Sequence, residues 1–253
     1  MLYIAIILAS ILHGITGMGF PMIGTVALSL HMPLSHAIVM LAIPCAMMSL
    51  LVLWVKPKTQ KLTLWAYCQY YWRLILFSVI GSILGVKLLL IVSDAFLYLV
   101  MAVVTLYYAI TGLLSQYTSI QPFNVKNTHY NQIIFGFIAG LVGSSTNAMS
   151  PILMMYLLNR SDNKDEIVKV SNICYLLSKL LQISLLHQEL SYLFSTQYVM
   201  LCLIMLISIV FLFMGVYIRP KLSTLFFRNL VYVVLLILGL KVEASGLMAV
   251  LLV

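Results

Sequence analysis

A polar stripe follows one face of the apolar stretch at residues 167–186, and a lysine, Lys179, lies near its centre. The polar residues recur every three or four positions, which is the spacing of one helix face; they are Ser171, Asn172, Tyr175, Ser178, Lys179 and Gln182. An ionisable side chain at mid-membrane costs about 2.5–3.5 kcal/mol on insertion scales and is functional by default. The pattern therefore predicts an ammonium group that faces the bundle interior and binds an anion. The alternatives are a lysine that reaches the membrane edge, or one that pairs with an acid.

Two other segments combine small residues with a proline in a way that disfavours a continuous helix. The first reads HGITGMGFP from His13, and the second reads GLVGSSTNAMSP from Gly140. Each glycine costs about 1 kcal/mol in a helix interior, and proline removes a hydrogen bond. A helix that opens inside a membrane exposes backbone N–H groups and a positive helix end, both of which attract anions. The alternative is that the small residues only permit close helix packing.

These three segments together predict a binding site for a small anion. The predicted substrate-binding residues are Gly17, Gly19, Gly143, Ser144, Ser145, Thr146 and Asn147 from the two breaks, with Asn172, Lys179 and Gln182 from the polar stripe. The acids fall in loops or at segment ends; they are Asp94, Asp162, Asp165, Glu166, Glu189 and Glu243. Because cation-coupled carriers often hold their ion with a membrane carboxylate, this distribution favours an anion as substrate. If transport needs a proton, its plausible carriers are His13 and Lys179.

The elements that position these residues are predicted to be membrane-spanning helices. Of the 253 residues, 63% are hydrophobic and 8% are charged, against about 45–50% apolar residues in a soluble domain. Apolar stretches lie at 2–30, 34–55, 72–92, 95–114, 132–158, 167–186, 198–218 and 226–253. They are too long and continuous for the strands of a membrane barrel. We expect an all-α integral membrane protein with about eight membrane segments.

An internal repeat divides the chain into two halves. Gly14-x-x-Gly17-x-Gly19 aligns with Gly140-x-x-Gly143-x-Ser145 at an offset of 126, and a proline follows each, while Gly85 aligns with Gly215 at an offset of 130. We predict a first transmembrane repeat at 1–114, a linker at 115–131 and a second transmembrane repeat at 132–253.

The basic residues indicate how the helices are oriented. Simple crossings place basic loops on both sides of the membrane, against the positive-inside rule. Re-entrant hairpins at the two broken segments resolve the conflict and make the two repeats inverted relative to each other. The basic residues that then lie inside are Lys56, Lys58, Lys61, Lys126, Arg160, Lys164, Lys169, Arg219, Lys221 and Arg228, with only Lys87 and Lys241 outside.

Other classes of protein are poorly supported. The net charge of +8 is spread singly through the chain without a basic stripe, which excludes nucleic acid as an expected partner. No nucleotide-binding loop, hydrolase motif or zinc motif is present, so we expect neither an enzyme nor a cofactor. Methionines near the breaks leave a soft-metal permease or channel as an alternative, and a non-transporting scaffold as another.

The sequence resembles the TauE/SafE family of membrane transporters, which are described as sulfite or sulfonate exporters. The resemblance rests on the two breaks with their prolines, the segment Gly81-x-x-x-Gly85, and the helix with Asn172, Lys179 and Gln182. It implies a multi-pass protein of the bacterial inner membrane, built from two four-segment repeats, whose partners are a small anion and the lipid bilayer. The second break departs from the family pattern, since Ser144-Ser145-Thr146-Asn147 replaces a glycine run. The sequence leaves open the anion, the choice between uniport and proton symport, and whether the protein forms a homodimer.

Overall fold

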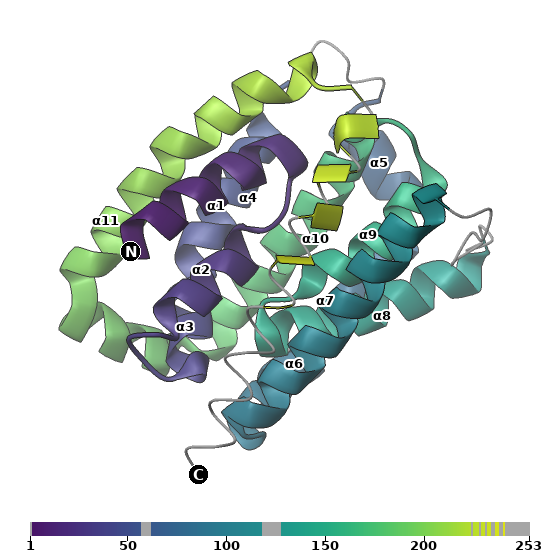
Figure 1. The fold of residues 1–253 in the computed structure, drawn as a ribbon. Helices are drawn as coiled ribbons and strands as arrows, with labels where there is room; N and C mark the ends of the chain where they lie inside the picture. Colours follow the sequence, from purple (N-terminus) through teal and green to yellow (C-terminus); the bar gives the residue numbers. More distant parts are fainter. Residues whose placement is uncertain are drawn as a thin grey trace.

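The computed structural model is a bundle of helices and describes residues 2–56, 62–117, 128–223 and parts of 225–240 (Figure 1). Within those residues there is no strand, as the all-α prediction requires. The helices are α1 (Leu2–Thr16), α2 (Phe20–Leu28), α3 (Leu34–Met40), α4 (Ala42–Trp54), α5 (Leu64–Tyr70), α6 (Trp72–Ile91), α7 (Asp94–Tyr117), α8 (His129–Thr146), α9 (Met149–Arg160), α10 (Lys164–Leu185), α11 (His187–Ile218) and the short 3-10 helix η1 (Arg219–Lys221). The sequence analysis missed α5 and the first turns of α11. The predicted last segment, 226–253, lies partly outside the described residues.

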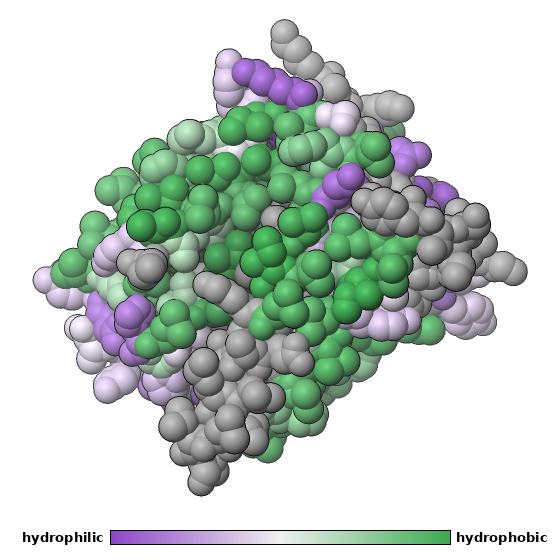
Figure 2. Space-filling view, in the orientation of Figure 1, coloured by the Kyte–Doolittle hydropathy of each residue, from purple (hydrophilic) through white to green (hydrophobic). Residues whose placement is uncertain are grey.

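The surface of the bundle is apolar over most of the face in Figure 2, with polar residues gathered toward its edges. Among the described residues, three helical stretches are long and apolar enough to cross a membrane: Leu34–Trp54, Trp72–Ile91 and His187–Lys221. Large side chains on these helices, including Leu76, Leu203 and Phe213, are exposed. An exposed apolar surface of this extent is suited to lipid, so the chain is a membrane protein.

Both predicted helix breaks are sharp turns after which the chain runs back. A Cβ atom on Gly24 in α2 would lie 3.6 Å from the side chain of Ile6 in α1. An unbroken helix would separate these two positions by about 27 Å. In the same way, the rings of Phe135 in α8 and Tyr156 in α9 lie 5.8 Å apart. The pairs α1/α2 and α8/α9 are therefore helical hairpins.

The two turns share one backbone geometry, 130 residues apart. Gly17 and Asn147 both have positive φ angles, of 73° and 62°. Just before them, the hydroxyls of Thr16 and Thr146 each donate to the carbonyl four residues earlier, at 2.7 Å in both cases. The glycine alignment at an offset of 126 does not describe the turns, because Gly143 lies inside α8 whereas Gly17 lies in the break. The asparagine thus stands where the first hairpin has glycine.

Each hairpin packs tightly against a helix from the other half of the chain. Helix α1 packs along α11, and α8 packs along α6. A Cβ on Gly215 would lie 2.1 Å from the Ile11 carbonyl oxygen, and one on Gly85 would lie 2.3 Å from that of Leu141. These contacts are also 130 residues apart, which supports the predicted repeat. Its boundaries stay predictions, since residues 118–127 of the linker and 241–253 of the second repeat lie outside the described residues.

The contact of α8 with α6 gives a test of this packing. A Cβ on Gly140 would lie 1.9 Å from the Ser78 carbonyl oxygen, and a backbone atom cannot move aside. We expect Gly140→Ala to destabilise the folded protein by about 1–3 kcal/mol, as overpacking does. Gly24→Ala is the matched control, because its Cβ would meet the flexible end of Leu41. Thermal unfolding in detergent measures both, and equal melting temperatures for the two variants would contradict the packing.

Candidate functional site

The polar stripe of α10 faces the centre of the bundle. Helix α10 packs against α4, α6, α8 and α9. The stripe residues are at most 4% exposed; they are Ser171, Asn172, Tyr175, Ser178, Lys179 and Gln182. On the opposite face, Leu180 is 48% exposed. The helical spacing in the sequence thus identified the buried face of this helix.

Lys179 is buried and does not reach toward the membrane edge. Its ammonium group donates to the side-chain oxygen of Asn147, and to Oε1 of Gln182 at 2.6 Å. Gln182 in turn donates from Nε2 to the Ser144 carbonyl at 2.9 Å. Among the described residues, no carboxylate lies within ion-pair distance of Lys179. The charge is therefore held by amide oxygens alone, all of them close to the break between α8 and α9.

Asn147 joins the two hairpins. Its positive φ ends α8, and its backbone N–H donates to the Gly143 carbonyl at 3.0 Å. Its side-chain amide donates to the Thr25 hydroxyl in α2 at 2.8 Å and to the Ile38 carbonyl in α3 at 3.4 Å. One side chain therefore connects Lys179 to both hairpins.

A second polar cluster surrounds the first break. Nε2 of His13 lies 3.1 Å from Oδ1 of Asn172, and Nδ2 of Asn172 donates to the Gly17 carbonyl at 3.2 Å. Nδ1 of His13 is buried, and no described residue offers it a hydrogen-bond partner. This cluster uses two of the predicted site residues, Gly17 and Asn172, and adds His13.

The other predicted residues serve the backbone of the hairpins. The hydroxyls of Ser145 and Thr146 donate to carbonyls of their own helix. Gly143 lies within α8 and accepts the hydrogen bond that ends it. Gly19 caps α2, and its carbonyl accepts from the N–H of Ile23. The structure thus brings Ser144, Asn147, Lys179 and Gln182 together. The hydroxyls of Ser145 and Thr146 bond to their own helix instead, and Gly143 joins the group through its backbone bond to Asn147.

Some partners at this centre had no signal in the sequence. Thr25 contacts Asn147 from a part of α2 that the motif analysis passed over. The hydroxyl of Ser82 in α6 lies 2.5 Å from that of Ser178. Tyr175, whose position on the stripe was recognised, donates to Ser150 at 2.9 Å. Which of these side chains contact each other depends on which helices pack together. The periodicity of the sequence does not predict that.

Two of the basic residues that were predicted to lie on the inner side of the membrane are buried within the protein. Lys169 is fully buried in α10 and donates to the carbonyls of Val52, Leu53 and Val55 at the end of α4. Arg219 is 4% exposed and donates twice to the Gly14 carbonyl, close to the end of α1. Both side chains satisfy carbonyls at helix C-termini, where cations are favoured. Lys58, Lys61, Lys126, Arg228 and Lys241 lie outside the described residues.

Two acids at the start of α10 complete this region. Asp165 lies 3.8 Å from the guanidinium of Arg219 and is buried with it. Glu166 accepts from the Tyr71 hydroxyl at 2.6 Å and from Ser161 at 2.9 Å. Burial, and then this bond to Glu166, raise the pKa of Tyr71 above its usual value, so that the phenol stays protonated. The sequence placed Asp165 correctly at a segment end but not in the interior.

Breaking this ion pair should destabilise the fold. Arg219→Met leaves the carboxylate of Asp165 and the carbonyl of Gly14 without their partner, a loss of about 3–5 kcal/mol for a buried pair. The double variant Asp165→Asn/Arg219→Met should recover part of that loss. Lys221→Met, at an exposed neighbouring position, is the control. Thermal unfolding measures the series, and an unchanged melting temperature for Arg219→Met would contradict the assignment.

The charges buried in the described part of the chain are mainly positive. They are Lys169, Lys179, Arg219 and Asp165. No group of three or more histidine, cysteine or acidic side chains suited to a metal ion occurs within the same residues. The electrostatics of the interior thus suit an anion.

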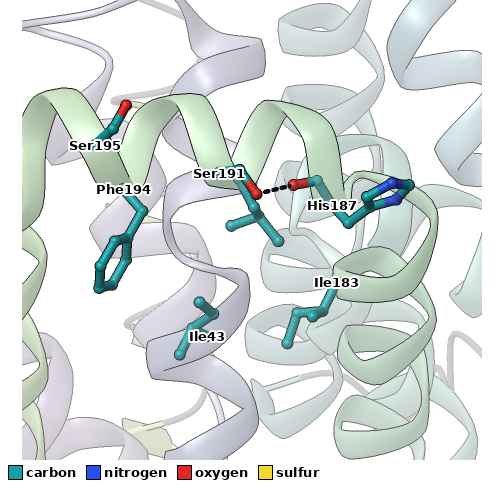
Figure 3. A pocket seen from close by; sticks show the side chains of 7 residues that line it. Ile43, Ile183, His187, Ser191, Phe194 and Ser195 are labelled. Atoms are coloured by element: carbon teal, nitrogen blue, oxygen red, sulfur yellow. Dashed lines mark hydrogen bonds between the residues drawn. The ribbon is translucent and has the colours of Figure 1, made fainter.

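An open pocket of about 370 Å³ lies beside the end of α10, where α11 begins. Figure 3 shows Ile43 and Ile183 beneath α11, facing Phe194 and Ser191. The pocket is mostly apolar and includes none of the residues bonded to Lys179. In this structure the polar groups around Lys179 are bonded to one another and do not line this pocket.

Comparison with known proteins agrees with the resemblance seen in the sequence. No curated protein and no solved structure matches the chain. A protein-family comparison matches residues 2–242 to "Sulfite exporter TauE/SafE". That match covers the helices from α1 to η1 and every residue of the site described above. The chain therefore belongs to the TauE/SafE family of membrane transporters for sulfite and related anions.

Proposed function

We propose that this protein is a secondary transporter of the bacterial inner membrane that exports a small organic or inorganic anion, such as sulfite or a sulfonate. The anion binds near mid-membrane, where the two hairpin turns meet the polar face of α10. Its principal ligand is the ammonium group of Lys179.

The observation that carries this proposal is the burial of Lys179 without an acidic partner in the described part of the chain. The residue is 4% exposed, and its hydrogen bonds go to two neutral side chains. A desolvated cation is costly unless it is paired and hydrogen-bonded. Amide oxygens satisfy its hydrogen bonds but leave its charge uncompensated. A substrate anion supplies the missing charge.

The surrounding groups can complete the binding of an oxyanion. The hydroxyl of Ser144 is buried and has no hydrogen-bond partner among the described residues, although its carbonyl holds Gln182. The Gln182 amide has two N–H groups, of which one donates to that carbonyl, whereas the N–H groups of Asn147 donate to Thr25 and Ile38. Donors from α8 and α10 thus lie near one ammonium group. This mixture of charge and neutral donors suits the several oxygens of sulfite or a sulfonate.

The direction of transport follows from the membrane potential. A monovalent anion that leaves a cell with a negative interior gains about 2.3 kcal/mol per 100 mV. Export thus proceeds without another energy source, whereas uptake requires coupling to a proton. No observation in the described residues favours a soft-metal permease, a cation channel or a scaffold over this function.

Replacement of Lys179 tests the site. We expect Lys179→Met to reduce anion efflux from proteoliposomes to the rate of protein-free liposomes, because the only cation in the network is lost. The variant should still insert, since methionine suits an apolar interior. Lys87→Met, at an exposed position of α6, is the control and should transport normally. The assay compares sulfite, sulfonates and simple carboxylates. Efflux by Lys179→Met at the wild-type rate would contradict the role assigned to Lys179.

We also propose that the hairpins are re-entrant and that the two halves of the protein have opposite orientations. The close approach of α1 to α2 and of α8 to α9 supports this topology. A reporter fused after Leu30 and one fused after Leu158 should then lie on opposite sides of the membrane. Two reporters on the same side would rule out the inverted arrangement.

A further inference from the structure

Lys179 is bonded to two carboxamide oxygens, and those oxygens occupy the position that an anion needs. The bonds to Asn147 and Gln182 use two of the three N–H groups of the ammonium. One N–H group is left, so an oxyanion that accepts two hydrogen bonds from the ammonium must displace one of these oxygens. Direct hydrogen bonds are what make an ion pair in a low-dielectric site strong. The protein and its substrate therefore compete for one cation.

We propose that Asn147 and Gln182 are internal ligands of Lys179 that close the empty site, and that an anion binds by displacing their oxygens. This inference rests on the proposed function and assigns a role within the same site. In the empty site the two oxygens accept hydrogen bonds from the ammonium, although its charge stays uncompensated. The exchange also sets a threshold, since a substrate must bind the ammonium better than two neutral amides do.

The backbone at Asn147 indicates that the side chain is there for this contact. The equivalent turn of the first hairpin has glycine, Gly17, in the same left-handed region. Glycine adopts this conformation without cost, whereas asparagine is tolerated there but is not required by the turn. The second turn therefore carries a side chain that the geometry alone does not call for. That side chain bonds Lys179 with its oxygen and Thr25 with its nitrogen.

Ser144 supplies an independent sign that a ligand belongs here. Its side chain is 1% exposed, and its hydroxyl has no hydrogen-bond partner among the described residues. A buried hydroxyl without a partner costs about 1–3 kcal/mol. Ser144 is also the residue whose carbonyl anchors Gln182. An anion that displaces the Gln182 oxygen from Lys179 arrives beside this free donor.

The experiment measures the accessibility of the Lys179 amine in the purified full-length protein. Potassium cyanate carbamoylates lysine, because the neutral amine adds across the C=N bond of isocyanic acid without a leaving group. Peptide mass spectrometry quantifies the modified Lys179 over time, with and without methanesulfonate as the competing anion.

Asn147→Gly removes one oxygen while keeping a residue suited to the turn. Gln182→Met removes the other oxygen, together with the hydrogen bond that Gln182 donates to the Ser144 carbonyl. Asn159→Ala, which removes an exposed amide from α9, is the matched control.

We expect carbamoylation of Lys179 to be several-fold faster in Asn147→Gly and Gln182→Met than in the wild-type protein and in Asn159→Ala. Half-maximal protection by methanesulfonate should require less anion in both variants. Asn147→Asp should abolish protection, because an anion would then have to displace a carboxylate. Wild-type rates of carbamoylation in both Asn147→Gly and Gln182→Met would overturn the proposal, as would full protection of Asn147→Asp.

Failure of the proposed function has a different result. In that case methanesulfonate protects no variant and no anion crosses proteoliposome membranes, yet the carbamoylation rates without anion still show whether the two oxygens shield Lys179. If anions protect Lys179 but removal of the oxygens changes no rate, the function stands and the internal-ligand role falls.

Discussion

The structure depends on a desolvated cation, Lys179, at the centre of a membrane protein. An ammonium group removed from water needs hydrogen-bond acceptors, and the hydrocarbon region offers none. Lys179 finds them in Asn147 and Gln182, which are themselves held by Thr25 and by the Ser144 carbonyl. The position of the hairpins relative to α10 is therefore coupled to the state of one side chain. A substrate that changes the bonding of Lys179 acts on contacts between both hairpins at once.

The hairpins create a second demand, because every interrupted helix leaves carbonyl groups without partners. Side chains from distant parts of the sequence donate hydrogen bonds to these carbonyl groups. Arg219 satisfies the Gly14 carbonyl, and Lys169 satisfies three carbonyls at the end of α4. These basic residues are structural and hold helix ends, yet their charge also adds to the positive interior. The asymmetry between three buried cations and one buried carboxylate, Asp165, among the described residues is thus a by-product of backbone requirements as well as a property of the site.

The two halves of the chain contribute unequally to the site. The positions 130 residues before Asn172, Lys179 and Gln182 hold Ala42, Ser49 and Val52. The first break has Gly17 where the second has Asn147. The first half therefore supplies mainly packing surfaces and the Thr25 hydroxyl, whereas the second half supplies the cation and its amides. Similar backbones thus carry different chemistry, since a helix tolerates most side chains on its inner face provided that their hydrogen bonds are met.

Hydropathy, the spacing of the polar stripe and the density of glycine and proline are local properties, and they sufficed for the all-α membrane class, for the buried face of α10 and for both breaks. The family resemblance also followed from ordered local motifs. Only the tertiary structure decided which polar residues meet. It separated Asn147 and Ser144 from Ser145 and Thr146, whose hydroxyls turn back to their own helix. It also showed that Lys169 and Arg219 are buried within the protein. The reason is that a hydrogen bond between Lys179 and Asn147, or between Arg219 and Gly14, requires helices distant in sequence to approach within a few ångströms, and no local pattern records that distance.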